Sequence, residues 1–98
     1  MLDEVGISYY IREEFELARK KGLPGVNEYQ SYDEWLEDHR KFVSELLKKG
    51  IRVVEIVVET EEFMDWCSIN KVSGDSAVSE YTAEMLRLGK RTGRIYIP

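Results

Sequence analysis

A run of β-branched residues at positions 51–58, IRVVEIVV, constrains the fold more than any other part of the chain. Such side chains favour extended backbone, and alternate residues of a strand face opposite sides of its sheet. Both alternating sets are apolar here apart from Arg52 and Glu55. Because a strand that is apolar on both faces is typical of a buried central position, we predict a central strand over residues 52–60.

The clearest helical pattern covers residues 31–49. Ser31 and Glu34 have the spacing of a capping box, in which each side chain bonds the other residue's backbone N–H. The apolar positions that follow at helical spacing form a broad stripe, which consists of Trp35, Leu36, His39, Phe42, Val43, Leu46 and Leu47. A stripe of this width is buried against another element, so this helix is predicted to pack on the central strand.

The N-terminal segment allows two interpretations. Ile11, Phe15 and Ala18 recur at helical spacing and Gly22 suits a left-handed helix end, which predicts a helix over residues 2–22. Residues 6–11 are instead aromatic and β-branched enough to form a short strand. Both alternatives stay open, because the pattern does not separate them.

Two further helices and a strand are predicted after the central strand. Thr60 is the expected N-cap of a short helix, residues 75–88 carry a second helical pattern, and residues 94–97 alternate as a strand does. A strand, a helical crossover and a second strand form a right-handed parallel unit. A reversal of the chain near residues 89–93 is the alternative, and it would change the pairing. The expected order of elements is α-α-β-α-α-β.

This order predicts a small single domain of the α/β or α+β class over residues 1–98, with a two- to three-stranded sheet covered by helices. A chain of 98 residues suffices for one compact but thin core. Two strands alone make a poor sheet. The predicted remedy is a third strand from residues 6–11, or completion of the sheet by dimerisation.

Charge and composition narrow the class of partner. The formal net charge is −5; residues 1–70 hold sixteen acidic and nine basic residues, whereas residues 71–98 hold three and five. An acidic body disfavours nucleic acid, which is a polyanion. The longest apolar runs are far shorter than the ~20 residues that span a bilayer, and the start of the chain has no signal-peptide pattern. With a single cysteine no intramolecular disulfide can form, so a cytoplasmic setting without membrane association is expected.

A candidate chemical site follows the central strand, where ligands bind in many open α/β sheets. Carboxylates gather there, and carboxylates can bind a divalent cation or act as an acid–base pair. The candidates are Glu59, Glu61, Glu62, Asp65 and the nearby Cys67. A helix N-terminus attracts acidic residues for electrostatic reasons alone, so the pattern does not by itself indicate a metal site.

A thiol nucleophile is the other catalytic possibility. Cys67 with His39 as its base is the minimal arrangement, but Phe63 and Trp66 lie on the same helix face and favour a core position for Cys67. The basic, glycine-rich stretch at residues 89–94 lacks the Walker pattern of a phosphate-binding loop. The sequence therefore predicts no cofactor and favours a binding protein over an enzyme.

Large aromatic residues are abundant for so thin a core, and Tyr and Trp are favoured at the centres of protein interfaces. The candidate interface comprises Tyr29, Tyr32, Trp35, Trp66 and Tyr96. This set predicts an interaction or self-assembly module, whose partner is a second copy of the chain in a homodimer or another protein.

Two alternative functions remain. One is an acidic regulator or inhibitor that binds a basic partner through Asp33, Glu34, Glu37, Asp38 and residues 59–65. The other is a small enzyme or metal-binding domain centred on residues 59–67.

Overall fold

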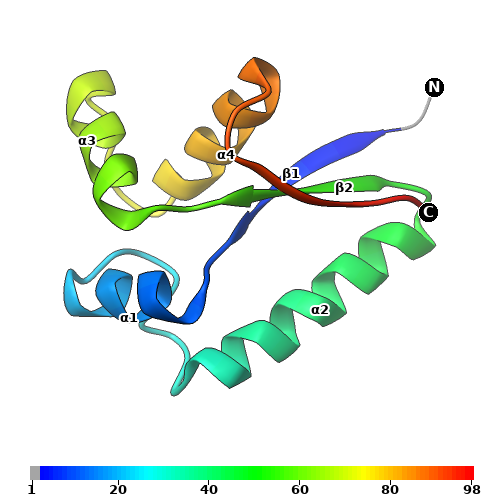
Figure 1. The fold of residues 1–98 in the computed structure, drawn as a ribbon, viewed down its shortest axis with the longest axis horizontal. Coiled ribbons are helices and arrows are strands. Elements are labelled where there is room, and N and C mark those ends of the chain that lie inside the picture. The colour runs from blue at the N-terminus through cyan, green and yellow to red at the C-terminus, as the bar shows by residue number, and fades with distance from the viewer. Residues whose placement is uncertain (1–2) are drawn as a thin grey trace.

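The computed structural model describes residues 3–98, which form three strands and four helices. In chain order these are β1 (Glu4–Tyr9), α1 (Arg12–Lys20), α2 (Tyr32–Lys48), β2 (Arg52–Val57), α3 (Thr60–Asn70), α4 (Ala77–Leu88) and β3 (Thr92–Tyr96). The strands form one mixed sheet in the order β1-β2-β3. Helix α2 lies on one side of this sheet, and α3 and α4 lie on the other (Figure 1). The chain therefore forms the small α+β domain with a central strand that its sequence predicts.

Strand β2 is central because both of its faces are covered. Val54, Ile56 and Val58 belong to the larger core cluster, which includes buried residues of α1, α3 and α4. Val53 faces the other way, toward a smaller cluster with Ile7 and Val43. The prediction of a strand that is apolar on both faces is thus confirmed, although β2 ends at Val57 and not at residue 60.

Residues 4–9 form strand β1, so the predicted helix over residues 2–22 is wrong in its first half and the strand alternative is confirmed. The helix itself is α1 alone, and residue 2 lies outside the described residues. β1 pairs in parallel with β2, from Glu4 beside Arg52 to Tyr9 beside Val57. The periodic residues Phe15 and Ala18 are buried in α1, but the periodicity does not extend back to residue 6. The third strand therefore comes from the chain itself.

The last strand runs antiparallel to β2, so the predicted parallel unit between residues 52–60 and 94–97 is wrong and the parallel pair is β1 with β2. Helices α3 and α4 bring the chain back beside the end of β2, where the Val57 N–H donates to the Arg91 carbonyl over 2.8 Å. From that point a strand that pairs with β2 can only run back along it. The structure therefore has the alternative pairing, in which the chain reverses near residues 89–93.

The two predicted helix caps have different outcomes. Ser31 Oγ accepts a hydrogen bond from the Glu34 N–H over 3.1 Å, as the capping-box spacing predicts. Thr60 does not cap α3 with its side chain. Its N–H donates to Glu14 Oε1 over 2.6 Å, and its hydroxyl donates to the Glu14 carbonyl over 3.0 Å. A carboxylate of α1 thus accepts a hydrogen bond from a backbone N–H in the first turn of α3. No local sequence pattern predicts this contact.

Helix α4 packs directly against β1 because Gly6 has no side chain. A Cβ at Gly6 would lie 3.2 Å from the Thr82 carbonyl oxygen and 3.3 Å from Leu86 Cβ. Both distances are shorter than ordinary van der Waals contact, so any side chain at this position would push α4 away from β1.

Replacing Gly6 with alanine is expected to lower the free energy of unfolding by about 1–3 kcal/mol, because α4 has to move away from β1 to admit the methyl group. Urea denaturation followed by circular dichroism measures the change. The neighbouring variant Ser8→Ala is the control, since no hydrogen bond of the Ser8 side chain to residues 3–98 is present, and it should alter stability by less than about 0.5 kcal/mol. Equal stability of the two variants would contradict the close packing at Gly6.

None of the helices within residues 3–98 combines the length and the apolar character needed to cross a membrane.

Candidate functional site

The open edge of β1 carries unused hydrogen-bonding groups. Among the described strands, β1 has only β2 as a neighbour. The Asp3 and Tyr9 carbonyls accept hydrogen bonds from Arg52 and Val58 on the β2 side. In a parallel pair alternate residues bond the same neighbour, so the odd-numbered residues of β1 face β2. Glu4, Gly6 and Ser8 consequently direct their N–H and C=O groups to the open side.

A hollow of about 460 Å³ lies along this edge, between α2 and α4. Its floor is residues 4–8 of β1, and Phe42 of α2 forms part of one wall. The opposite wall comes from α4 and includes Val78, Thr82 and Leu86. Phe42 is 49% exposed despite its size. The edge of β1 is thus flanked by apolar side chains of two helices.

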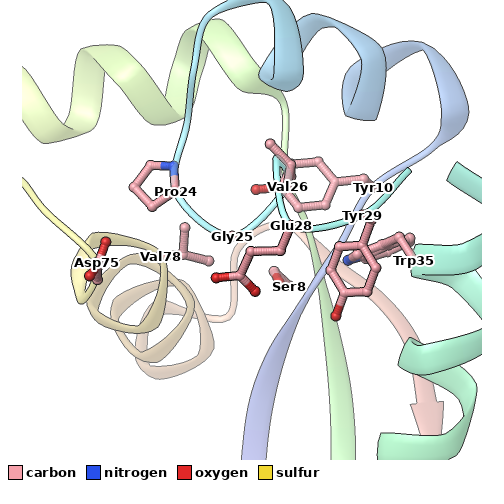
Figure 2. A pocket seen from close by; sticks show the side chains of 10 residues that line it. All are labelled: Ser8, Tyr10, Pro24, Gly25, Val26, Glu28, Tyr29, Trp35, Asp75 and Val78. Atoms are coloured by element: carbon pink, nitrogen blue, oxygen red, sulfur yellow. The ribbon is translucent and has the colours of Figure 1, made fainter. Parts of the chain in front are cut away.

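A second hollow of about 360 Å³ continues from the first at the C-terminal end of β1, and the two share Ser8 and Val78. We call it the terminal recess; its ten lining residues come from β1, the loop before α2, α2 itself and the start of α4 (Figure 2). They are Ser8, Tyr10, Pro24, Gly25, Val26, Glu28, Tyr29, Trp35, Asp75 and Val78.

A third, smaller hollow of about 150 Å³ includes Ser8, Tyr29, Trp35 and Phe42 and adds Asp38 and His39. The three adjoining hollows together are termed the β1 groove.

The charges that line the β1 groove are negative. Its carboxylates are Glu4, Glu28, Asp38 and Asp75, and neither Lys nor Arg lines any of its three hollows. Glu4 lies 3.3 Å from Arg52 Nε, whereas Glu28 and Asp75 form no ion pair with any residue in the range 3–98. Low-dielectric walls strengthen the field of such charges. The groove therefore favours a cationic occupant.

Asp38 fixes the orientation of one aromatic side chain of the groove. The Tyr29 hydroxyl donates to Asp38 Oδ2 over 2.5 Å. This hydrogen bond, together with partial burial, raises the pKa of Tyr29 to about 12. The phenol is therefore neutral at physiological pH, and its ring is held at the rim of the terminal recess.

A buried, hydrogen-bonded pair of ionisable residues lies between α2 and the sheet, beside the groove. His39 Nε2 and Glu55 Oε2 are 2.8 Å apart, and both side chains are only 6% exposed. The Tyr96 hydroxyl donates to the same Glu55 oxygen over 3.2 Å, and the Trp35 ring stacks on His39 at 5.0 Å. Sequence reasoning singled out His39 but missed Glu55. The sequence did contain a signal for the pair. His39 is the one ionisable residue in the apolar stripe of α2, and Glu55 is the one ionisable residue on the face of β2 that packs against α2.

The carboxylates proposed from the sequence as a metal or acid–base site meet a cation of the chain itself. Arg91 Nε donates to Glu62 Oε1 over 2.9 Å, and its guanidinium lies 3.5 Å from Glu59. Glu61 and Asp65 are exposed on α3. Within residues 3–98, no three His, Cys, Asp or Glu side chains converge as a metal site requires.

Cys67 and His39 are held by different parts of the fold. Cys67 is half-buried on α3 and packs against the larger core cluster. Burial, with a smaller effect of Glu80, raises the pKa of its thiol, which disfavours the reactive thiolate. His39 lies on α2, across the sheet from α3 (Figure 1), and is bound to Glu55. The structure does not bring the two together.

The five aromatic residues proposed as an interface do not form one surface. Tyr32 and Trp35 are each 7% exposed and stack on one another within the core. Tyr29 is half-buried and shares the terminal recess with the exposed edge of Trp35. Trp66 packs edge-on against Tyr81 at 5.3 Å, and Tyr96 binds Glu55. Burial of Tyr32 and Trp35 follows from their contacts with Phe15 of α1, which the sequence does not reveal.

Sequence reasoning missed four polar residues of the terminal recess: Ser8, Tyr10, Glu28 and Asp75. They come from three separate segments, so no spacing in the sequence relates them.

Comparison of the chain with protein-family models, with curated proteins and with solved structures finds no match.

Proposed function

We propose that this domain is a protein-interaction module that binds an extended, basic segment of a partner polypeptide along the open edge of β1. The observation that carries the proposal is the unpaired edge at the floor of a groove between two helices. A peptide that adds as a further strand satisfies the outward N–H and C=O groups of Glu4, Gly6 and Ser8. Its side chains then alternate between the two sides of the new strand.

The lining of the groove selects the chemistry of the peptide. Carboxylates without ion pairs, Glu28 and Asp75, favour lysine or arginine at one end. Apolar side chains of α2 and α4, such as Phe42 and Leu86, favour aliphatic residues along the strand. A peptide with aliphatic residues along the strand and lysine at the end beside the terminal recess fits this lining. An acidic module of this kind acts on its partner by covering a basic segment. The partner in this proposal is a cytoplasmic protein.

A second copy of the chain is a less favoured occupant. Antiparallel pairing of two β1 edges would bring the acidic linings of both grooves together, and like charges across an interface disfavour association. Sedimentation equilibrium at micromolar concentration distinguishes the two occupants. A stable dimer would replace the basic peptide as the partner in this proposal.

Peptide titration tests the function directly. The probe, termed the lysine–valine peptide, is a fluorescein-labelled run of valine with lysine at one end, about seven residues long because a strand rises ~3.3 Å per residue and β1 must be spanned. The matched control carries glutamate in place of lysine. Binding should shift the backbone amide signals of Gly6 and Ser8 in ¹⁵N NMR spectra and weaken as salt is added. Shifts confined to α3 or β3, or equal binding of both peptides, would overturn the proposal.

The variant Ser8→Pro is expected to weaken binding of the lysine–valine peptide about tenfold, since it removes an N–H on the open side of β1 and adds a ring there. Proline is tolerated on an edge strand where its nitrogen faces outward, and that N–H does not bond β2, so the fold should persist. Fluorescence anisotropy measures the affinity.

Ser8→Ala keeps the N–H and should bind as the natural protein does. A peptide with one N-methylated residue provides a second test that leaves the protein unchanged. Unaltered affinity in both tests would exclude strand addition at β1.

A further inference from the structure

We infer that a segment bound along β1 inserts one large apolar side chain, such as leucine, toward α4 at the position that pairs with Gly6. We call it the anchor side chain. This inference rests on the proposed function, because the anchor side chain reaches α4 only from a strand that pairs with β1. It adds which position of the partner segment determines specificity and which helix contacts that position.

The two faces of β1 are distinguished by the contacts of its own residues. Ile7 packs with Val43 of α2, so this side chain faces α2. A Cβ at Gly6 would instead contact Thr82 and Leu86, so Gly6 faces α4. Gly6 also directs its backbone N–H and C=O groups to the open edge, since the odd-numbered residues of β1 bond β2. The open edge at Gly6 thus lies beside α4.

A residue of an added strand that pairs with Gly6 places its side chain on the face that Gly6 occupies, because directly opposite residues of neighbouring strands share a face. This holds for a parallel and for an antiparallel addition. The side chain at this position therefore points toward α4. The residues before and after it point the other way, toward α2 and Phe42.

The α4 wall of the 460 Å³ hollow is uncharged and has room for a large side chain. The residues of α4 that line it are Val78, Ser79, Thr82, Ala83 and Leu86. Ser79 and Ala83 are small, exposed and one helical turn apart, whereas Val78 and Leu86 offer apolar contact. The Thr82 hydroxyl donates to the Ser79 carbonyl over 3.0 Å, so its proton is already used. A charged side chain would find no ionic partner on this wall, and an apolar one loses nothing by entering.

Gly6 brings this wall close to an added strand. Its missing side chain lets α4 rest directly on β1, so the helix lies nearer to the sheet than it could with side chains on both elements. A side chain that points toward α4 from the neighbouring strand consequently contacts the helix instead of solvent. The apolar area that it buries there favours binding in proportion to its size.

The test compares two fluorescein-labelled peptides of seven residues. Both consist of threonine with lysine at one end, and the central residue is leucine in one and alanine in the other. Threonine favours extended backbone, and leucine is then the one large apolar side chain. Fluorescence anisotropy should show that the leucine peptide binds about tenfold more tightly than the alanine peptide. In NMR spectra of the complex, nuclear Overhauser contacts should join the leucine methyl groups to Val78 and Ala83. Contacts to Phe42 in their place would overturn the inference.

The variant Ser79→Leu fills the hollow from α4 and leaves the edge of β1 unchanged. It should reduce the tenfold preference for the leucine peptide to less than about twofold, because the leucine of the protein takes the place of the anchor side chain. Ser44→Leu is the matched control, since it makes the same exchange at an exposed position of α2 that lines none of the three hollows. It should keep the tenfold preference. Phe42→Ala should weaken both peptides by a similar factor and keep their ratio, because Phe42 lies on the other wall.

A thermal melt of each variant separates lost binding from lost structure; Ser79 and Ser44 are both exposed, so both leucine variants should remain folded. A preference for leucine that survives Ser79→Leu, or that disappears in Phe42→Ala, would contradict the placement of the anchor side chain against α4.

The outcomes also separate this inference from the proposed function. Equal binding of the two peptides, with shifts of the Gly6 and Ser8 amide signals, keeps strand addition and removes the anchor side chain. Preferential binding of the leucine peptide without shifts of those amide signals removes both.

Discussion

Replacing His39 with leucine is expected to lower the free energy of unfolding by about 3–5 kcal/mol, because it leaves the buried Glu55 carboxylate without its 2.8 Å partner. Only the neutral Tyr96 hydroxyl, 3.2 Å away, would still bind that oxygen. The reverse variant, Glu55→Leu, should cost about 1–3 kcal/mol, since it leaves the buried His39 Nε2 without its hydrogen-bond partner. Urea denaturation followed by far-ultraviolet circular dichroism measures both, and avoids the fluorescence of Trp35, which stacks on His39.

The double variant His39→Leu/Glu55→Leu should be close to the natural protein in stability, because replacing both members of a buried pair by apolar residues is often neutral. A cycle built from the two single variants and the double variant then gives a coupling energy of several kcal/mol. Glu45→Leu, which removes an exposed carboxylate from α2, is the control and should change stability by less than about 0.5 kcal/mol. Additive effects of the two single variants would show that the pair does not act as a unit.

Replacing Phe15 with alanine is expected to lower the free energy of unfolding by about 3–5 kcal/mol, since it opens a cavity at the centre of the aromatic core. Phe15 is 0% exposed. Its ring contacts Tyr10, Tyr32 and Trp35, with centroids between 5.5 and 6.3 Å apart. Thermal and urea denaturation measure the loss, which is a large part of the ~5–15 kcal/mol that stabilises a typical domain.

Phe42→Ala is the matched control, because it makes the same chemical change at a residue that is 49% exposed. It should cost well under half as much stability as Phe15→Ala, yet weaken the lysine–valine peptide, since Phe42 lines the β1 groove. Phe15→Leu keeps most of the volume and should fall between the two. Equal costs for Phe15→Ala and Phe42→Ala would contradict the assignment of α1 as a packed layer of the core.

The His39–Glu55 pair and the terminal recess show why the candidate site was only partly predictable from the sequence. His39 and Glu55 are visible in the sequence as isolated ionisable residues in apolar patterns, but their pairing requires knowing which face of α2 rests on β2. Tyr29 and Trp35 were singled out for their aromatic character, and both line the terminal recess. The two carboxylates that line the same recess, Glu28 and Asp75, lie in loops whose positions depend on the packing of α1, α2 and α4.

The sequence by itself determined the elements whose signals are local. The N-cap Ser31 and the apolar stripe after it define α2, and the two-sided apolar run defines β2 as central. Local signals suffice there because capping and periodicity act within a few residues of the chain.

Only the tertiary structure decided how these elements combine: residues 4–9 as a strand, the antiparallel direction of β3, the Glu14 carboxylate at the start of α3, and the open groove along β1. Each depends on contacts between residues far apart in the chain. The free energy of such contacts comes from burial and pairing in the folded state. A short segment of sequence therefore cannot predict them.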